Sequence, residues 1–196
     1  MPKTKTSREE IIIAAWREFH AGGYGATSVQ RLATAAGLGK AGLLHHFGSK
    51  EGVMHAVIDY ALEWYRARVL TMLQTDEPLP VRLERFIRRH FELCVLNDGA
   101  GCFFANTILE TGVDGTFGEQ TRKFHDEWTA ATETLFREWL PAERAAEVAY
   151  RLFADYQGSV VLYKLYRDPS HLDRFLARTL GAVEELKAAN TPPTTE

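Results

Sequence analysis

The sequence predicts an all-α protein of nine helices, and three observations support this fold class. Apolar residues recur at offsets of three and four along most of the 196 residues. Alternating apolar and polar runs of strand length are absent, and clusters of Gly, Pro, Asn and Asp separate the helical segments. The composition, 45% hydrophobic and 25% charged, is that of a globular chain long enough for one domain or two unequal ones.

Three short helices are expected within the first fifty residues. A helix over 8–21 is indicated by Ser7 and Glu10, which have the spacing of a capping box. Helices over 29–36 and 40–47 follow, with a glycine-containing turn between them. The last two helices have the lengths of a helix-turn-helix, in which the second helix lies in the major groove of DNA.

Six further helices are expected in the rest of the chain, because apolar stripes of helical spacing alternate with loop-forming clusters. Apolar residues on more than one side of the eighth helix, together with those of the ninth, indicate a helical interface with a second copy. The six expected ranges run from Ser49 to before Asp76, from about Leu83 to Asn97, and over 102–110, 117–140, 142–166 and 169–189.

The charge is divided unevenly along the chain, although the net charge is only −3. Residues 1–50 contain seven Lys or Arg and three Asp or Glu, a net charge of +4. Residues 51–196 contain 16 Lys or Arg and 23 Asp or Glu, a net charge of −7. A basic end on an acidic body is the asymmetry expected where one end meets a polyanion.

The sequence contains no pattern typical of a metal site, a membrane span or an enzyme. Cys94 and Cys102 lack a Cys-x-x-Cys or His pair at ligand spacing, so no metal is expected. No apolar run reaches roughly 18 residues and no signal-type segment is present, so we expect a cytoplasmic protein without membrane contact. Phosphate-loop, zinc-protease and nucleophile-elbow motifs are absent, so no catalytic residue or cofactor is expected. The alternative, an all-α small-molecule carrier or an enzyme without DNA binding, leaves the basic end unexplained.

The helix-turn-helix segment carries a family resemblance. Residues 27–53, TSVQRLATAAGLGKAGLLHHFGSKEGV, run from a capped helix through Ala-x-x-x-Gly-Leu to a short helix ending in His-His-Phe-x-x-Lys-Glu. This pattern resembles the signature of the TetR family of bacterial repressors. The resemblance implies a nine-helix homodimer that binds a palindromic operator in double-stranded DNA and releases it when a small-molecule effector binds. It also implies a DNA-binding domain over 1–48 and a ligand-binding and dimerisation domain over 49–189, before a tail over 190–196 that we expect to be disordered.

The candidate DNA contacts come from two sources. Some are implied by this resemblance, and others are residues expected to face outward on the helices over 29–36 and 40–47. Gly42 and Leu44 depart from the family pattern, which usually has Thr or Ser and Tyr there, so the operator sequence is left open. Base contacts are expected from the exposed side of the third helix, and phosphate contacts from helix ends. The candidates are Thr27, Ser28, Gln30, Lys40, Ala41, Gly42, Leu44, His45, His46 and Lys50.

The resemblance places an effector pocket among the fourth to eighth helices, where aromatic residues and polar residues within apolar stripes are the candidates. The alternative for each of them is ordinary core packing or an internal hydrogen-bond network. Cys102, at the start of the sixth helix, is either a thiol activated by the helix dipole or a packing residue. The candidates are Trp64, Tyr65, Phe86, His90, Phe91, Cys102, Phe103, Asn106, Glu110, Phe124, Trp128, Tyr156 and Gln157.

Overall fold

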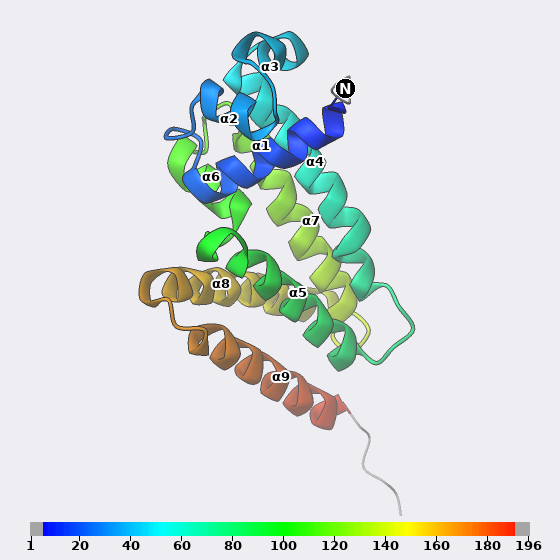
Figure 1. Ribbon diagram of the computed structural model, residues 1–196. Coiled ribbons are helices and arrows are strands. Elements are labelled where there is room, and N and C mark those ends of the chain that lie inside the picture. Colours follow the sequence, from blue (N-terminus) through cyan, green and yellow to red (C-terminus); the bar gives the residue numbers. More distant parts are fainter. Residues whose placement is uncertain (1–5, 191–196) are drawn as a thin grey trace, which may run out of the picture. The chain divides into compact units, whose positions relative to one another are not determined.

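The computed structural model describes residues 6–190, and this part of the chain contains nine α-helices, one 3₁₀ helix and no β-strand (Figure 1). The prediction of an all-α fold with nine helices is confirmed. None of the helices in the described range combines the length and apolar character that a membrane crossing requires. Positions 191–196 of the expected tail lie outside the described residues. The helices are α1 (Arg8–Gly22), α2 (Val29–Ala35), α3 (Lys40–Phe47), α4 (Lys50–Arg68), η1 (Leu70–Leu73), α5 (Leu79–Gly99), α6 (Phe103–Thr111), α7 (Gly118–Phe136), α8 (Ala142–Tyr166) and α9 (Ser170–Asn190).

The predicted N-terminal caps explain where the first helices begin. The Ser7 hydroxyl accepts a hydrogen bond from the Glu10 N–H at 3.1 Å, and the Glu10 carboxylate accepts one from the Ser7 N–H at 2.7 Å. The bond from the Ser7 N–H to the charged carboxylate lowers the pKa of Glu10. The Ser28 hydroxyl accepts the N–H of Arg31 at 3.1 Å and begins α2 in the same way.

Three of the longer helices differ from their expected ranges at an end. α4 ends at Arg68 rather than just before Asp76, and the separate 3₁₀ helix η1 follows over Leu70–Leu73. α5 begins at Leu79 rather than near Leu83. Pro80 lies in its first turn, where backbone N–H groups have no partner within the helix, so a proline is tolerated there. α7 ends at Phe136 rather than Leu140. The chain there tightens into turns in which the Trp139 N–H donates to the carbonyl of Phe136 at 3.0 Å, which is typical of a helix terminus.

The chain packs as two compact units that do not follow its linear order. Unit 1 contains residues 6–65 and 103–124, and unit 2 contains residues 66–102 and 125–190. Helices α4 and α7 therefore contribute residues to both units. This division describes packing, and the functional division after residue 48 stays a prediction.

Helices α1, α2 and α3 lie next to the start of α4 (Figure 1). The core that they form is mainly apolar, and its apolar residues recur at helical spacing on each helix. The fully buried members are Ile11 and Ala15 of α1, Leu32 and Ala33 of α2, Leu43 of α3, and Val53 and Val57 of α4. This small core fixes α3 relative to α2.

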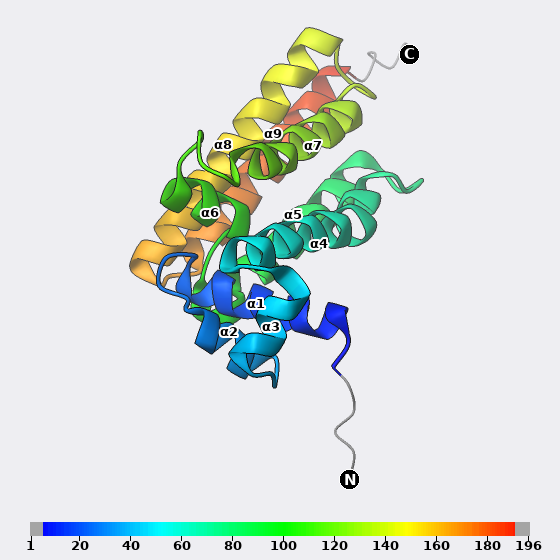
Figure 2. The same cartoon turned by 90° about the horizontal axis from the view of Figure 1, so that it is seen from above.

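In unit 2, α9 runs back along α8, and the two helices lie side by side in both views (Figures 1 and 2). The chain reverses after α8 at Arg167, which adopts the left-handed conformation with φ +56°. Phe175 and Val183 of α9 are buried. The C-terminal part of α8 leaves Val161 and Leu165 at 56% and 68% exposure, an unusual amount of apolar surface on one helix.

Candidate nucleic-acid interface

A short turn containing Gly37 joins α2 to α3. Gly37 has φ +68°, a left-handed conformation that a Cβ atom disfavours, so the backbone of the expected turn requires this glycine. The Gly37 N–H donates to the carbonyl of Thr34 at 3.0 Å, and the Leu38 N–H donates to that of Ala33 at 2.8 Å. These two bonds satisfy the last carbonyls of α2 and set the direction in which α3 leaves the turn.

Helix α3 is attached to the unit 1 core by Leu43, which has no exposed surface. Lys40, Ala41, His45 and His46 are exposed, whereas Gly42 and Leu44 are half-buried. One side of the helix is therefore anchored and the remaining surface carries a cation, two imidazoles and small residues. Such a surface can donate hydrogen bonds to base edges and phosphates.

Gly42 is not required by packing within unit 1. A Cβ atom built at this position lies 3.9 Å from the Cβ of Leu38, an ordinary van der Waals distance. Because the fold has room for a methyl group there, the missing side chain instead leaves the surface of α3 open to close approach by another molecule.

Two of the phosphate-contact candidates have hydrogen-bond partners within unit 1, and their contacts with DNA stay predictions. Thr27 has no exposed surface, and its hydroxyl donates to the Gly23 carbonyl at 2.6 Å, so its side chain stabilises the loop between α1 and α2. Lys50 is half-buried, and its ammonium donates to the Tyr24 carbonyl at 2.7 Å while lying 4.3 Å from the centre of the Tyr24 ring. Both side chains are engaged inside unit 1, a use that local sequence spacing does not reveal.

Ser28 and Gln30 lie at the exposed start of α2. Ser28 caps the helix, and the Gln30 amide donates to the hydroxyl of Thr34 at 3.3 Å. Their contacts with the DNA backbone stay predictions, as do those of the α3 residues.

Glu110, a candidate for the effector site, binds backbone groups of its own chain in the structure. Its side chain is exposed and accepts the backbone N–H groups of Tyr24 and Gly25, each at 2.7 Å. These groups belong to the loop that leads into α2. The partners are 86 and 85 residues away along the chain, so no local pattern could have indicated this contact.

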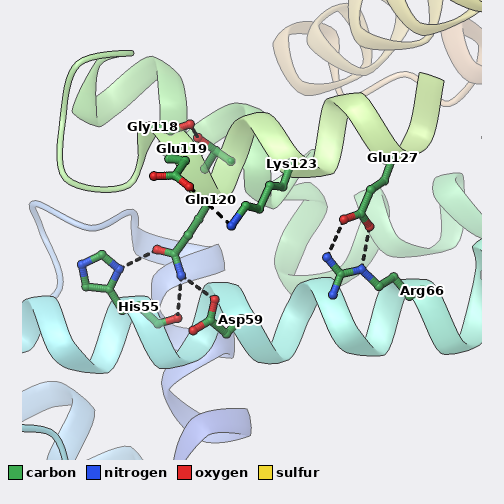
Figure 3. Close-up of polar contacts among 9 residues, drawn as sticks. His55, Asp59, Arg66, Gly118, Glu119, Gln120, Lys123 and Glu127 are labelled. Atoms are coloured by element: carbon green, nitrogen blue, oxygen red, sulfur yellow. Dashed lines mark hydrogen bonds and ion pairs between the residues drawn. The ribbon is translucent and has the colours of Figure 1, made fainter. Parts of the chain in front are cut away.

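Polar contacts between α4 and α7, which sequence analysis did not predict, occur in each unit (Figure 3). In unit 1 the Gln120 amide oxygen accepts from Nδ1 of His55 at 2.5 Å, and the amide nitrogen donates to Asp59 at 2.5 Å. Because an amide oxygen only accepts, Nδ1 carries the hydrogen. In unit 2 Arg66 forms a two-pronged ion pair with Glu127, with Nε 2.7 Å from one carboxylate oxygen.

Comparisons with known proteins agree with the helix-turn-helix geometry. Residues 11–57 match the family described as bacterial regulatory proteins, tetR family. The nucleoid occlusion factor SlmA of Marinobacter nauticus is 30% identical over 141 residues, which cover 71% of this chain and 70% of that protein. The chain belongs to the TetR family.

Two further similarities extend over most of the TetR-family fold. The transcriptional repressor DhaR of a Mycobacterium species is 24% identical over 184 residues, covering 90% of this chain and 91% of that protein. A TetR regulator from Legionella pneumophila has a similar structure, with a TM-score of 0.80, 20% identity, and coverage of 96% of this chain and 100% of that one. The chain is thus a DNA-binding transcriptional regulator, and regulators of the TetR family bind DNA and dimerise.

The aromatic effector candidates of unit 1 in this TetR-family chain contact other aromatic rings. The rings of Phe103 and Trp64 lie edge-on to Trp16, with centres 6.0 and 5.9 Å away. Phe124 contacts Tyr65, with ring centres 4.9 Å apart, and both residues are buried. Trp64 is half-buried, as is Asn106, so these two keep some surface within unit 1.

In unit 2, the candidates centre on the buried ring of His90. Its Nε2 accepts a hydrogen bond from Trp128 Nε1 at 2.9 Å, and its Nδ1 donates to the Phe86 carbonyl at 2.8 Å. Burial lowers the pKa of His90 to about 4, so the ring is neutral at pH 7. The internal network, which was the alternative to an effector contact, therefore satisfies both nitrogens of this histidine.

Both cysteines are buried in unit 2. The Cys94 sulfur lies 3.0 Å from the Tyr156 hydroxyl, and burial raises the pKa of this thiol. Cys102 is 7% exposed, and the Gln157 amide nitrogen lies 3.8 Å from its sulfur. Limited access to the Cys102 sulfur favours packing over reaction with an electrophile. Phe91, the remaining candidate, is half-buried against Phe175.

Two grooves within unit 2 do not involve the effector candidates. One, of about 970 Å³, lies along η1 and α5 and is bordered by Met72, Val81 and Arg88 among others. The other, of about 510 Å³, is bordered by Leu73, Arg82 and other residues. None of the thirteen effector candidates lines either groove. In the described part of the chain, no group of three or more His, Cys, Asp or Glu is arranged to hold a metal ion.

Proposed function

We propose that the protein is a homodimeric repressor that binds a palindromic operator through α3 and is released when a small-molecule effector binds. The observation that carries this proposal is the anchoring of α3. Leu43 fixes the helix to the unit 1 core, while Lys40, Ala41 and His45 face outward. A rigid helix with outward polar groups suits the major groove, where each base pair presents a distinct pattern of donors and acceptors.

The side chains of α3 differ in what they can recognise. Lys40 can donate to the O6 and N7 acceptors of guanine, the commonest type of specific contact. His45 offers an imidazole to a base edge, and Gly42 leaves room for the DNA to approach the helix backbone. His46, near the end of α3, is our candidate for a phosphate contact, which strengthens binding without selecting sequence.

A second copy is proposed to cover the apolar surface of α8. Tyr150, Val161, Leu165 and Tyr166 are each more than half exposed, and the first three lie within one sector of the helix. Water contact with so much apolar surface is unfavourable, and a symmetric pair would remove it. Two-fold symmetry then places two copies of α3 roughly 34–36 Å apart, which matches half-sites one DNA turn apart.

An effector would act by binding one arrangement of the protein better than another, so that operator affinity falls in proportion to this preference. Besides Glu110, the effector candidates that keep exposed surface are Trp64 and Asn106 in unit 1 and Phe91 and Gln157 in unit 2. The fully buried candidates are assigned to packing. Helix α4 is our candidate for the connection to DNA binding, because it begins beside the helix-turn-helix.

The test uses the full chain and duplexes from the DNA upstream of its own gene. Fluorescence anisotropy at increasing salt should reveal a specific complex whose affinity falls steeply with ionic strength. Replacing Lys40 by Gln should weaken that complex about tenfold, since one base contact is worth ~1–3 kcal/mol. Lys123→Gln, on α7, is the control with the same charge change and should alter affinity by less than about twofold. Absence of specific binding would overturn the proposed function, and equal losses at both lysines would overturn the role of α3.

A further inference from the structure

The loop between α1 and α2 encloses the carboxylate of Glu110, a residue of α6. One carboxylate oxygen accepts the Tyr24 N–H at 2.7 Å and the other accepts the Gly25 N–H at 2.7 Å. Hydrogen bonds from backbone amides to an ionised carboxylate are among the stronger ones in proteins. All the atoms involved belong to unit 1.

The loop backbone is shaped to fit this carboxylate. Gly23 has φ +78°, and a Cβ atom built there would lie 2.8 Å from one Glu110 oxygen. A Cβ atom at Gly25 would lie 2.9 Å from the other oxygen. Both distances are shorter than a van der Waals contact, so a side chain at either glycine would have to displace the carboxylate.

The same loop is also held from the start of α4. The Lys50 ammonium donates to the Tyr24 carbonyl at 2.7 Å. Tyr24 therefore donates its N–H to α6 and accepts at its carbonyl from α4. The loop continues directly into Thr27 and the Ser28 cap of α2, so its position determines where α2 begins.

We propose that Glu110 is a positioning residue for operator binding, which couples the position of α6 to that of the helix-turn-helix through the Tyr24 and Gly25 amides. This inference rests on the proposed function. A shift of α6 would move or release the loop, and α2, whose packing against α3 sets the angle of the DNA-reading surface, would follow.

The coupling makes a prediction opposite in sign to that of simple electrostatics. Removing a carboxylate should strengthen binding to DNA, because it removes repulsion from the phosphates. Glu110→Gln also removes one acceptor and turns an NH₂ group toward a backbone N–H donor. If Glu110 positions the loop, this variant binds its operator more weakly despite its more favourable charge.

The first experiment compares the wild type, Glu110→Gln and the control Glu119→Gln. The exposed carboxylate of Glu119 lies 3.5 Å from the ammonium of Lys123, one turn further along α7. Affinity is measured on an upstream duplex that the wild type binds specifically. We expect about tenfold weaker binding for Glu110→Gln, equivalent to about 1.4 kcal/mol, and unchanged or tighter binding for Glu119→Gln. Amide exchange in the DNA-free protein should be faster at Tyr24 and Gly25 in Glu110→Gln.

A second variant separates positioning from charge. Gly25→Ala leaves the net charge unchanged but displaces the carboxylate, so it should reproduce the loss of affinity. When Glu110 is already Ala, adding Gly25→Ala should weaken binding by less than about twofold, because the two changes act on one contact.

The outcomes distinguish the two proposals. A wild-type protein that binds no upstream duplex overturns the proposed function. Specific binding by the wild type, together with wild-type affinity and exchange in Glu110→Gln, overturns the role of Glu110 alone. Additive losses in the Gly25 and Glu110 double variant would also overturn that role.

Discussion

The buried histidine of unit 2 makes stability depend on pH in a window that can be calculated. Burial lowers the pKa of His90 to about 4 in the folded chain, against an ordinary value of 6.5. Above pH 6.5 the ring is neutral in both states. As the pH falls from 6.5 toward 4, the unfolded chain binds a proton that the folded chain does not, so stability is lost across this window. The total loss is about 3 kcal/mol, a large share of a typical net stability of roughly 5–15 kcal/mol.

The assay is urea unfolding at pH 7 and pH 5 for the wild type and His90→Gln. Glutamine keeps an acceptor for the Trp128 N–H, which lies 2.9 Å from His90 Nε2, and removes the titration. The stability advantage of the wild type over this variant should shrink by about 2 kcal/mol between the two pH values. Phe86→Leu, a change in a fully buried neighbour, should lower the free energy of unfolding by the same amount at pH 7 and at pH 5. A difference between wild type and His90→Gln that is independent of pH would refute the reasoning.

Two substitutions test the packing of the helix-turn-helix. Gly42→Ala should raise the free energy of unfolding by about 0.5–1 kcal/mol, seen as a Tm increase of about 2 °C, because alanine favours helix and its Cβ meets only ordinary contact with Leu38 at 3.9 Å. A lower Tm would contradict the open space at this position. Leu43→Ala should cost about 2–5 kcal/mol in chemical denaturation, since Leu43 is fully buried, whereas Leu109→Ala, at 79% exposure, should change stability by less than about 0.5 kcal/mol. Similar losses at both leucines would refute the assignment of Leu43 to the core.

The position of Glu110 has a consequence for regulation. Helix α6 touches the loop into α2, and α4 touches the same loop through Lys50. A ligand that shifted either helix would therefore act on one short segment, Gly23 to Gly25. The energetic coupling needed for regulation is modest, since about 1.4 kcal/mol of difference between two states changes affinity tenfold.

The sequence by itself determined the local architecture. Helix positions follow from apolar residues at intervals of three and four, and their starts follow from caps such as Ser7 with Glu10, because these signals act within a few residues. The turn at Gly37 was predictable for the same reason, since only its own backbone conformation requires glycine. The helix-turn-helix and the family membership were accessible because they occupy one short continuous segment.

Only the tertiary structure decided which polar groups are available for function. Thr27, Lys50 and Glu110 have the same residue types whether they face DNA, a ligand or their own chain, and their partners are set by packing. The neutral state of His90 likewise depends on its burial, to which α7 contributes Trp128, the residue that donates its ring N–H to His90 Nε2. Hydrogen bonds and desolvation act over a few ångströms in space, and distance along the chain does not specify which groups come that close.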